Sequence, residues 1–227
     1  MRTPPVLLAI LAGMFAVLAV SPVDRLTWVL ENAAFAAAIV FLVVTRRRAP
    51  LSNVAYSLVF VFLALHELGA HYTYSLVPYG DWCARLSGRP VDLDRNHFDR
   101  FVHLCFGLLV APALREFLRA FVALRGAAAF WLPLFTTIAW SALYELVEWS
   151  AALVFGGEAS YAYVGSQGDP WDAQKDMALA AAGATLSLAL VTVLERARAS
   201  ASRAGTRPAP RPRRRWRALR GLRETSP

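Results

Sequence analysis

Charged residues are scarce in this sequence. Only 18% of its 227 residues are Asp, Glu, Lys or Arg, whereas 57% are hydrophobic and the mean hydropathy is +0.41. An ordinary soluble domain carries about 25% charged residues. This balance excludes a disordered chain and argues strongly against a soluble one.

Cysteine is also scarce, because Cys83 and Cys105 are the only two. Two cysteines at these positions are too few for a disulfide framework. The sequence is nevertheless basic, with a formal net charge of +8 and a pI near 10.2. Eleven of the 24 Lys and Arg residues follow Glu195. The basicity therefore belongs largely to the C-terminal tail, which points to membrane topology, and we expect no nucleic-acid partner.

Six apolar runs are long enough to cross a membrane as helices. A hydrocarbon core of roughly 30 Å needs about 20 apolar helical residues. The first run lacks a clean cleavage site, so we interpret it as a helix and not as a signal peptide. The sequence thus predicts an all-α, polytopic integral membrane protein over residues 1–197, followed by a basic, disordered cytoplasmic tail over 198–227. The six runs are Pro4 to Val23, Leu26 to Thr45, Leu51 to Ala70, Asn96 to Leu114, Gly126 to Phe155 and Met177 to Leu194.

The distribution of charge predicts the orientation. With the N-terminus inside, the inner segments hold 18 of the 24 basic residues but only 3 of the 16 acidic ones. The net charge is then +15 inside and −7 outside. Cytoplasmic loops carry the excess of Lys and Arg in membrane proteins. We therefore predict six spans, both termini in the cytoplasm, and a multi-pass protein of the bacterial inner membrane.

The tail allows two interpretations. Trp216, Leu219 and Leu222 recur every three residues between arginines, which is compatible with a short surface helix attracted to anionic lipid headgroups. The simpler interpretation is a solvated segment that only sets the topology. Membrane lipid is the partner expected in either case.

Histidine and acidic residues gather at the outer ends of the predicted helices. Charged groups are expensive in hydrocarbon, so they should face inward and line one polar cavity. Asp99 and His103 are four residues apart and share a helix face, as do Glu67 and His71. The candidate metal ligands are His66, Glu67, His71, His97 and His103, and the candidate catalytic residues are His71, Asp99, His103, Glu145, Glu148, Asp172 and Asp176.

Two polar segments flank these residues. One precedes the fourth span and the other, Gly165 to Asp172, leads into the sixth, where Asp172 could also act only as a helix cap. The candidate substrate-binding residues in these segments are Arg95, Asn96, Arg100, Gln167 and Asp169. We expect Arg95 or Arg100 to pair with a carboxylate.

Three functions suit this set of residues. A divalent metal held by His and carboxylates could activate water for hydrolysis. The residues could instead form a structural salt-bridge network, or bind a ligand or handle protons. His66 and His71 are five residues apart, so the segment lacks the four-residue spacing of the HExxH zinc motif.

Four segments carry a resemblance to a known family. They are HELGAHYTYSLVPYGDW (His66 to Trp82), RNHFDRFVHLCFGLL (Arg95 to Leu109), ALYELVEW (Ala142 to Trp149) and GSQGDPWDAQKDM (Gly165 to Met177). With them the sequence resembles the uncharacterised YjdF-type inner-membrane proteins of bacteria, a domain of unknown function. The resemblance implies a multi-pass helical membrane protein and no particular reaction.

A looser likeness is to the VanZ-like membrane proteins. Glu145, Asp176 and Gly183 fit their pattern, whereas Glu148 stands where that family has Gln and Ala180 where it has Asn. These departures put a shared mechanism in doubt.

Two classes of function follow. The first is a membrane-embedded, metal-dependent hydrolase that acts on a lipid or envelope-linked substrate. The second is a non-enzymatic protein that binds or transports a cation or other ligand. The charge-poor inner halves of the helices favour a one-sided site over a pathway through the membrane. The oligomeric state is left open.

The predicted orientation can be checked by labelling cysteines in intact cells. A membrane-impermeant maleimide should label Cys83, which lies in an outer segment. It should not label a cysteine introduced by Ser200→Cys in a Cys83→Ser background until the membrane is permeabilised. The reverse pattern would refute the orientation.

Overall fold

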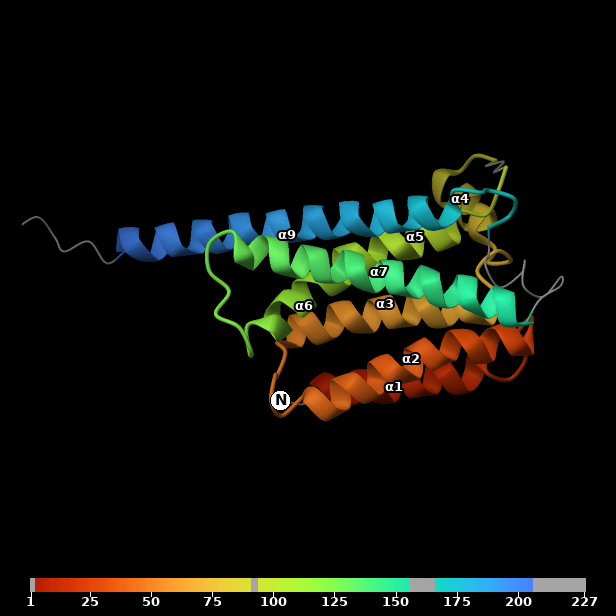
Figure 1. Cartoon of the computed structure of the whole chain (residues 1–227), viewed down its shortest axis with the longest axis horizontal. Helices are drawn as coiled ribbons and strands as arrows, with labels where there is room; N and C mark the ends of the chain where they lie inside the picture. The colour runs from red at the N-terminus through yellow and green to blue at the C-terminus, as the bar shows by residue number, and fades with distance from the viewer. Residues whose placement is uncertain (1–2, 91–93, 156–165, 206–227) are drawn as a thin grey trace, which may run out of the picture. The chain divides into compact units, whose positions relative to one another are not determined.

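The protein is all-helical in the residues that the computed structural model describes, which are 3–90, 94–155 and 166–205. The predicted fold class is confirmed in this respect. The fourth predicted span is made of three consecutive helical segments, one of them a π-helix (Figure 1). The elements are α1 (Thr3–Leu18), α2 (Arg25–Thr45), α3 (Asn53–His71), α4 (Tyr79–Ser87), α5 (Phe98–Cys105), η1 (Phe106–Val110), α6 (Ala111–Leu118), α7 (Ala128–Phe155) and α9 (Asp172–Gly205).

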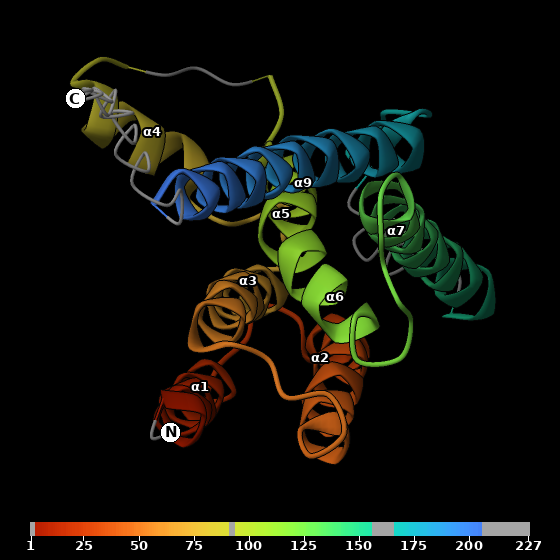
Figure 2. The same ribbon diagram turned by 90° about the vertical axis from the view of Figure 1, so that its left-hand side faces the viewer.

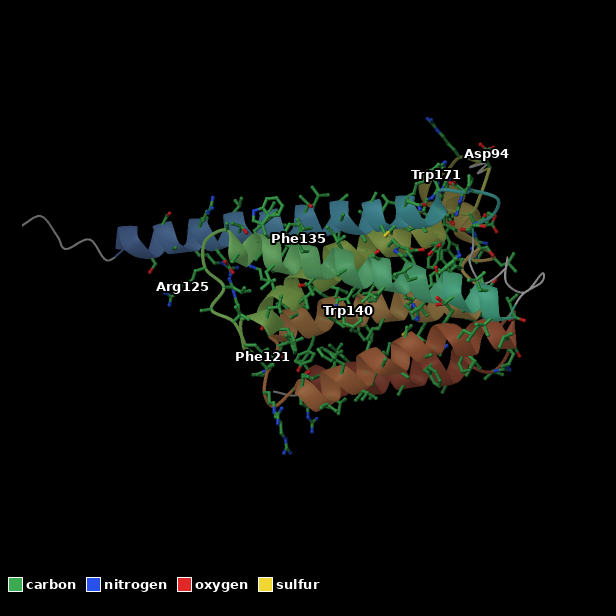
Figure 3. All side chains as sticks on the ribbon, in the orientation of Figure 1. Asp94, Phe121, Arg125, Phe135, Trp140 and Trp171 are labelled. Carbon is green, nitrogen blue, oxygen red and sulfur yellow. The ribbon has the colours of Figure 1, made fainter. Side chains whose placement is uncertain are left out.

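Five of the described helical segments are long and apolar enough to cross a membrane. They coincide with the second to sixth predicted spans and make the chain a polytopic membrane protein. Large apolar side chains on their outer faces stay exposed, such as Phe135 at 59% and Trp140 at 57% on α7 (Figure 3). Helix α1 is also apolar but has only 16 residues.

The helix α9 extends further than the sequence suggests. It continues to Gly205, so residues 198–205, which the sequence assigns to the tail, are helical. The proposed surface helix around Trp216 lies outside the described residues. The chain divides into two compact units, Met1–Thr192 and Val193–Pro227, and the contacts described below lie within the first.

Helix α3 occupies the centre of the first unit. It contacts α1 and α2 on one side and the α5–η1–α6 span on the other, and α6 in turn packs against α7 (Figure 2). Leu11, Phe35, Leu63 and Ala113 belong to one buried cluster that joins α1, α2, α3 and α6.

Side chains define where the helices begin. Asp24 Oδ1 accepts a hydrogen bond from the Thr27 amide at 2.7 Å, which caps α2. Ser52 Oγ accepts one from the Ala55 amide at 3.1 Å and caps α3. Such caps satisfy amides that have no partner within the helix. The Ser52 amide and hydroxyl both donate to the Glu116 carboxylate, which ties the start of α3 to α6.

The π-helix lies close against the backbone of α9. A methyl group added at Gly107 would overlap the backbone of Ala180 and Ala184 on α9, and one at Gly183 would overlap that of Leu104. Small residues permit such contacts between membrane helices. The Gly107 carbonyl accepts a hydrogen bond from Ser187 Oγ at 3.2 Å, so α9 supplies a partner within this irregular turn.

The two ends of the first unit differ in composition. Asp94 and Trp171 lie at one end, together with α4, whereas Phe121 and Arg125 lie at the other (Figures 1 and 3). Helix α4 was not predicted and replaces part of what the sequence suggested to be a loop. Gly88 ends it in a left-handed conformation with φ of 67°, which glycine adopts at little cost.

The close contact of η1 with α9 predicts strong sensitivity to size. Gly107→Ala and Gly183→Ala should each lower the free energy of unfolding by about 1–3 kcal/mol, because the methyl group meets backbone atoms that cannot move aside. Gly13→Ala is the matched control, since a methyl group there meets nothing within 4 Å. Thermal unfolding in detergent measures the difference, and equal stability of all three variants would contradict the packing.

Candidate functional site

Two segments far apart in the sequence meet at the end of the helices that carries Asp94. The Asn96 amide donates to Gln167 Oε1 at 2.9 Å, and Gln167 Nε2 donates back to the Asn96 carbonyl at 3.0 Å. The Asn96 side chain donates to the carbonyls of Ser75 and Val77 and accepts from the Phe98 amide. Asn96 and Gln167 thus link the connections that precede α4, α5 and α9, and their side chains form hydrogen bonds within the protein.

The ion-pair cluster, defined as Arg95, Arg100, Asp169 and Asp172, lies beside this junction. Arg95 Nη1 is 2.8 Å from Asp172 Oδ1, and its Nη2 donates to Oδ2 at 3.1 Å, so the contact is bidentate. Arg100 Nη2 donates to Asp169 Oδ2 at 2.5 Å and to Asp172 Oδ1 at 3.2 Å. The expected pairing of the two arginines with carboxylates is confirmed.

Lys175 extends the ion-pair cluster toward solvent. Its Nζ lies 2.5 Å from Asp169 Oδ2, and its side chain is 49% exposed. This bond and the Trp171 amide lower the pKa of Asp169 to about 2. Since an unperturbed Asp has a pKa near 3.9, any stabilisation from its ionised form is complete above that value and is lost as the pH falls through about 2.

The buried acidic cluster, defined as Asp99, His103, Glu145 and Asp176, lies on α5, α7 and α9. His103 Nε2 is 3.6 Å from Asp99 Oδ1 and 3.3 Å from Glu145 Oε1. One ligand atom each from Asp99, His103 and Asp176 lies within 4.8 Å of the others. The sequence predicts that these four side chains share one pocket with His71. The structure brings the four together, but His71 lies apart from them.

Two oxygens of the buried acidic cluster have no hydrogen-bond partner among the described residues. They are Asp176 Oδ1 and Glu145 Oε1. The contact of Glu145 with His103 is at ion-pair distance but lacks the alignment of a hydrogen bond. The arginines of the ion-pair cluster donate to Asp169 and Asp172, and also to the Ser166 carbonyl and to His97 Nδ1. A buried carboxylate without a partner is costly, and the cluster is therefore suited to receive a cation.

A chain of polar contacts continues from the buried acidic cluster to α2 and α3. Glu148 is buried, lies close to Glu145, and is within electrostatic range of Glu31. Tyr144 OH donates to Glu31 Oε2 at 2.5 Å, and its ring lies edge-on to that of His103, with centroids 6.0 Å apart. Glu31 is only 1% exposed. Tyr144 therefore connects α2 to the helix that carries Glu145.

Both ring nitrogens of His66 form hydrogen bonds with neighbouring groups. Its Nε2 must donate to the Glu31 carbonyl, 3.2 Å away, so its Nδ1 accepts from Tyr74 OH at 2.6 Å. Burial, together with the charges of Glu31, Asp99 and Glu148, raises the pKa of Tyr74 well above its ordinary value. Tyr74 consequently remains a donor. Both nitrogens of His66 are thus engaged, so the metal-ligand role predicted for it would require one of these hydrogen bonds to break.

Three further predicted metal ligands lie apart from the buried acidic cluster. His71 Nδ1 donates to the Leu18 carbonyl at 2.7 Å, so this side chain faces the end of α1 and does not share the predicted pocket. His97 Nδ1 accepts from Arg100 at 3.5 Å, and burial and the charges of Arg100 and Arg95 lower its pKa. Glu67 is fully buried, and its oxygens have no hydrogen-bond partner among the described residues. Of the five predicted ligands, His103 alone belongs to the metal-competent group.

Tyr74, Tyr144 and Glu31 adjoin these groups but are not among the catalytic, binding or metal-ligating residues predicted from the sequence. Glu31 carried a signal, since it is an acidic residue inside an apolar run. The tyrosines carried none, because aromatic residues near a membrane surface are ordinary. Asp172, which the sequence predicts to be a catalytic residue or a helix cap, is the central acceptor of the ion-pair cluster.

The ion-pair cluster should stabilise the fold in proportion to its burial. Asp172→Asn leaves two partly buried guanidinium groups without their main acceptor and should cost about 1–3 kcal/mol. Lys175→Gln, the exposed control, should have little effect. Thermal unfolding of the detergent-solubilised protein compares the two variants. An equal loss of stability in both would show that burial does not determine the strength of these ion pairs.

Comparisons with known proteins agree with this architecture. Residues 4–197 match the family model described as "Predicted membrane protein (DUF2238)". The inner membrane protein YjdF of Escherichia coli (strain K12) is 38% identical over 163 residues, which are 71% of this chain and 75% of that protein. No solved structure matches at a significant level. The chain is a multi-pass inner-membrane protein and belongs to the DUF2238 family.

Proposed function

We propose that the protein binds a divalent metal ion at Asp99, His103 and Asp176. The observation that carries the proposal is the convergence of their ligand atoms within 4.8 Å, next to two buried oxygens that have no hydrogen-bond partner among the described residues. In a tetrahedral zinc site, ligand atoms at about 2.0–2.2 Å from the ion are about 3.3–3.6 Å apart, so the group, whose atoms lie within 4.8 Å of one another, must contract by up to about 1.5 Å to close on an ion.

The ligand set suggests which metal would bind. One imidazole nitrogen and two carboxylates suit Zn²⁺ or Mn²⁺ better than Cu(I), which prefers sulfur ligands. Three protein ligands leave a position for water, as in catalytic zinc sites. Asp99 and His103 come from one turn of α5 and Asp176 from the first turns of α9, so two rigid helices hold the site.

The chemistry that follows is metal-dependent hydrolysis. A bound metal lowers the pKa of its water toward 7 and so supplies hydroxide at neutral pH. Glu145 Oε1, which is 3.3 Å from His103 Nε2, is placed to take the proton from that water. The substrate class that suits this position is an ester or phosphoester of a lipid or of an envelope-linked molecule.

We further propose six spans with both termini in the cytoplasm, so that the site opens outward. At about 1.5 Å per residue, the 16 residues of α1 give about 24 Å, and the adjoining apolar residues could extend the span. Arg125 and Asp94 lie at opposite ends of the first unit (Figure 3), which supports the segregation of charge. The predicted lipid contact of the C-terminal tail remains part of this proposal.

A second function is cation binding without catalysis. The close approach of Glu148 to Glu145, and the short contact of Tyr144 with Glu31, add buried acidic groups beyond those a catalytic centre needs. Such groups could serve a cation-binding or transport protein. The two functions differ in what Glu145 must do.

Metal content tests the first proposal. The detergent-purified protein, dialysed against Zn²⁺ or Mn²⁺, should retain one equivalent, and Asp176→Asn and His103→Gln should each weaken binding by at least tenfold. Glu67→Gln is the matched control, because Glu67 is equally buried but lies outside the metal-competent group. The site would be refuted if the wild-type protein retained no metal after dialysis, or if Glu67→Gln weakened metal binding as much as the other two variants do.

Glu145→Gln separates catalysis from binding. Loss of a general base costs about 10²–10⁴-fold in rate. The variant should therefore keep its metal and lose hydrolysis of fluorogenic phospholipid and ester substrates by about that factor. Absence of metal-dependent hydrolysis in the wild-type protein across that panel would favour the cation-binding function.

A further inference from the structure

An apolar groove runs between α1 and α3, away from the helices of the buried acidic cluster. Its volume is about 640 Å³, within the range of sites that hold one ligand molecule. No titratable side chain contributes to its lining. The lining includes Gly13, Met14 and Val17 of α1 and Phe60, Ala64 and Leu68 of α3.

Glycine keeps one side of the groove open. A Cβ atom built at Gly13 meets no heavy atom within 4 Å, so the wall of α1 is hollow at this point. Both helices have the composition of membrane segments. Hydrocarbon, and not water, is therefore the medium that the groove meets.

Two basic side chains lie where the groove ends. Leu18 lines the groove, and its carbonyl accepts the hydrogen bond of His71 Nδ1, which leaves His71 Nε2 for an outside partner. The Arg25 guanidinium donates to the carbonyls of Ala19 and Val20, directly after Leu18, and is exposed. The apolar groove thus ends beside the positive charge of Arg25 and the imidazole of His71.

We propose that this groove binds one anionic phospholipid of the surrounding leaflet. An acyl chain fills the groove between α1 and α3, the phosphate contacts Arg25 at its mouth, and a hydroxyl group of the headgroup donates to His71 Nε2, which is an acceptor when Nδ1 carries the proton. The charge at the mouth explains a preference for an anionic headgroup, since basic residues near a membrane attract anionic lipid. The apolar lining accounts for the chain, which gains stability from each buried methylene group.

The site is independent of the proposed metal centre. Its residues lie on α1, on α3 and at the start of α2, whereas the proposed metal ligands lie on α5 and α9. Lipid binding can therefore fail while metal binding succeeds, and the reverse. In this proposal His71 takes part in recognition of the lipid headgroup.

The test titrates the detergent-purified full chain with phosphatidylglycerol or phosphatidylcholine, with native mass spectrometry and thermal unfolding as readouts. Phosphatidylglycerol should bind saturably with one lipid per chain and should bind more tightly than phosphatidylcholine. Arg25→Gln and His71→Gln should each weaken the binding of phosphatidylglycerol about fivefold and leave the binding of phosphatidylcholine unchanged. Gly13→Leu fills the groove without meeting another atom at its Cβ and should weaken both lipids at least tenfold.

Val40→Leu is the control, because Val40 is 60% exposed on α2 and lies outside the groove lining. It should bind both lipids as the wild-type protein does. The proposal is overturned if Gly13→Leu binds phosphatidylglycerol like the control, or if the two lipids bind the wild-type protein equally. Since Gly13→Leu leaves Arg25 and His71 in place, it tests the groove even if a change at the mouth disturbs the adjacent turn.

Discussion

Carboxyl groups among apolar membrane helices impose the constraint on which the rest of this structure depends. A charge at the centre of a membrane helix costs about 2.5–3.5 kcal/mol, and less toward the surface. Asp99, Glu145, Glu148 and Asp176 are buried or half-buried on three different helices. Packing of α3 against the α5–η1–α6 span, and of Gly107 against α9, brings those helices close enough for the carboxyl groups to meet. The apolar contacts and the acidic cluster are therefore parts of one arrangement.

The basic side chains divide this polar end into two layers. Arg95, before α5, and Arg100, on its first turn, donate to Asp169, before α9, and to Asp172, at the start of α9. The layer below is the buried acidic cluster, and His103 is its one basic side chain. Two of its acidic oxygens, Glu145 Oε1 and Asp176 Oδ1, have no hydrogen-bond partner among the described residues. The salt-bridge network expected from the sequence thus exists, but it explains the upper layer and not the lower one. That separation is the reason to propose a metal for the lower layer.

Much of the fold could be predicted because hydrophobicity alone determines membrane helices. The second to sixth spans follow from apolar runs, and the four-residue spacing of Asp99 and His103 gives their shared face. Other features depend on contacts between distant segments. His66 and His71 each satisfy carbonyls of other helices, Glu31 and Leu18, and no local pattern shows where those carbonyls lie. The same holds for Tyr144, whose partner Glu31 is 113 residues away in the sequence. Helix α4 and the π-helix were missed because neither is a long apolar run.

The central claim is that Asp99, His103 and Asp176 are ligands of one metal ion. X-ray absorption spectroscopy at the zinc edge of the zinc-loaded protein tests it most directly. We expect oxygen and nitrogen scatterers at about 2.0–2.1 Å from the zinc and the outer-shell signal of one imidazole, because His103 is the only histidine in the group. A sulfur scatterer at about 2.3 Å, or the signal of two or more imidazoles, would show that the metal is bound elsewhere and that these three residues are not its ligands.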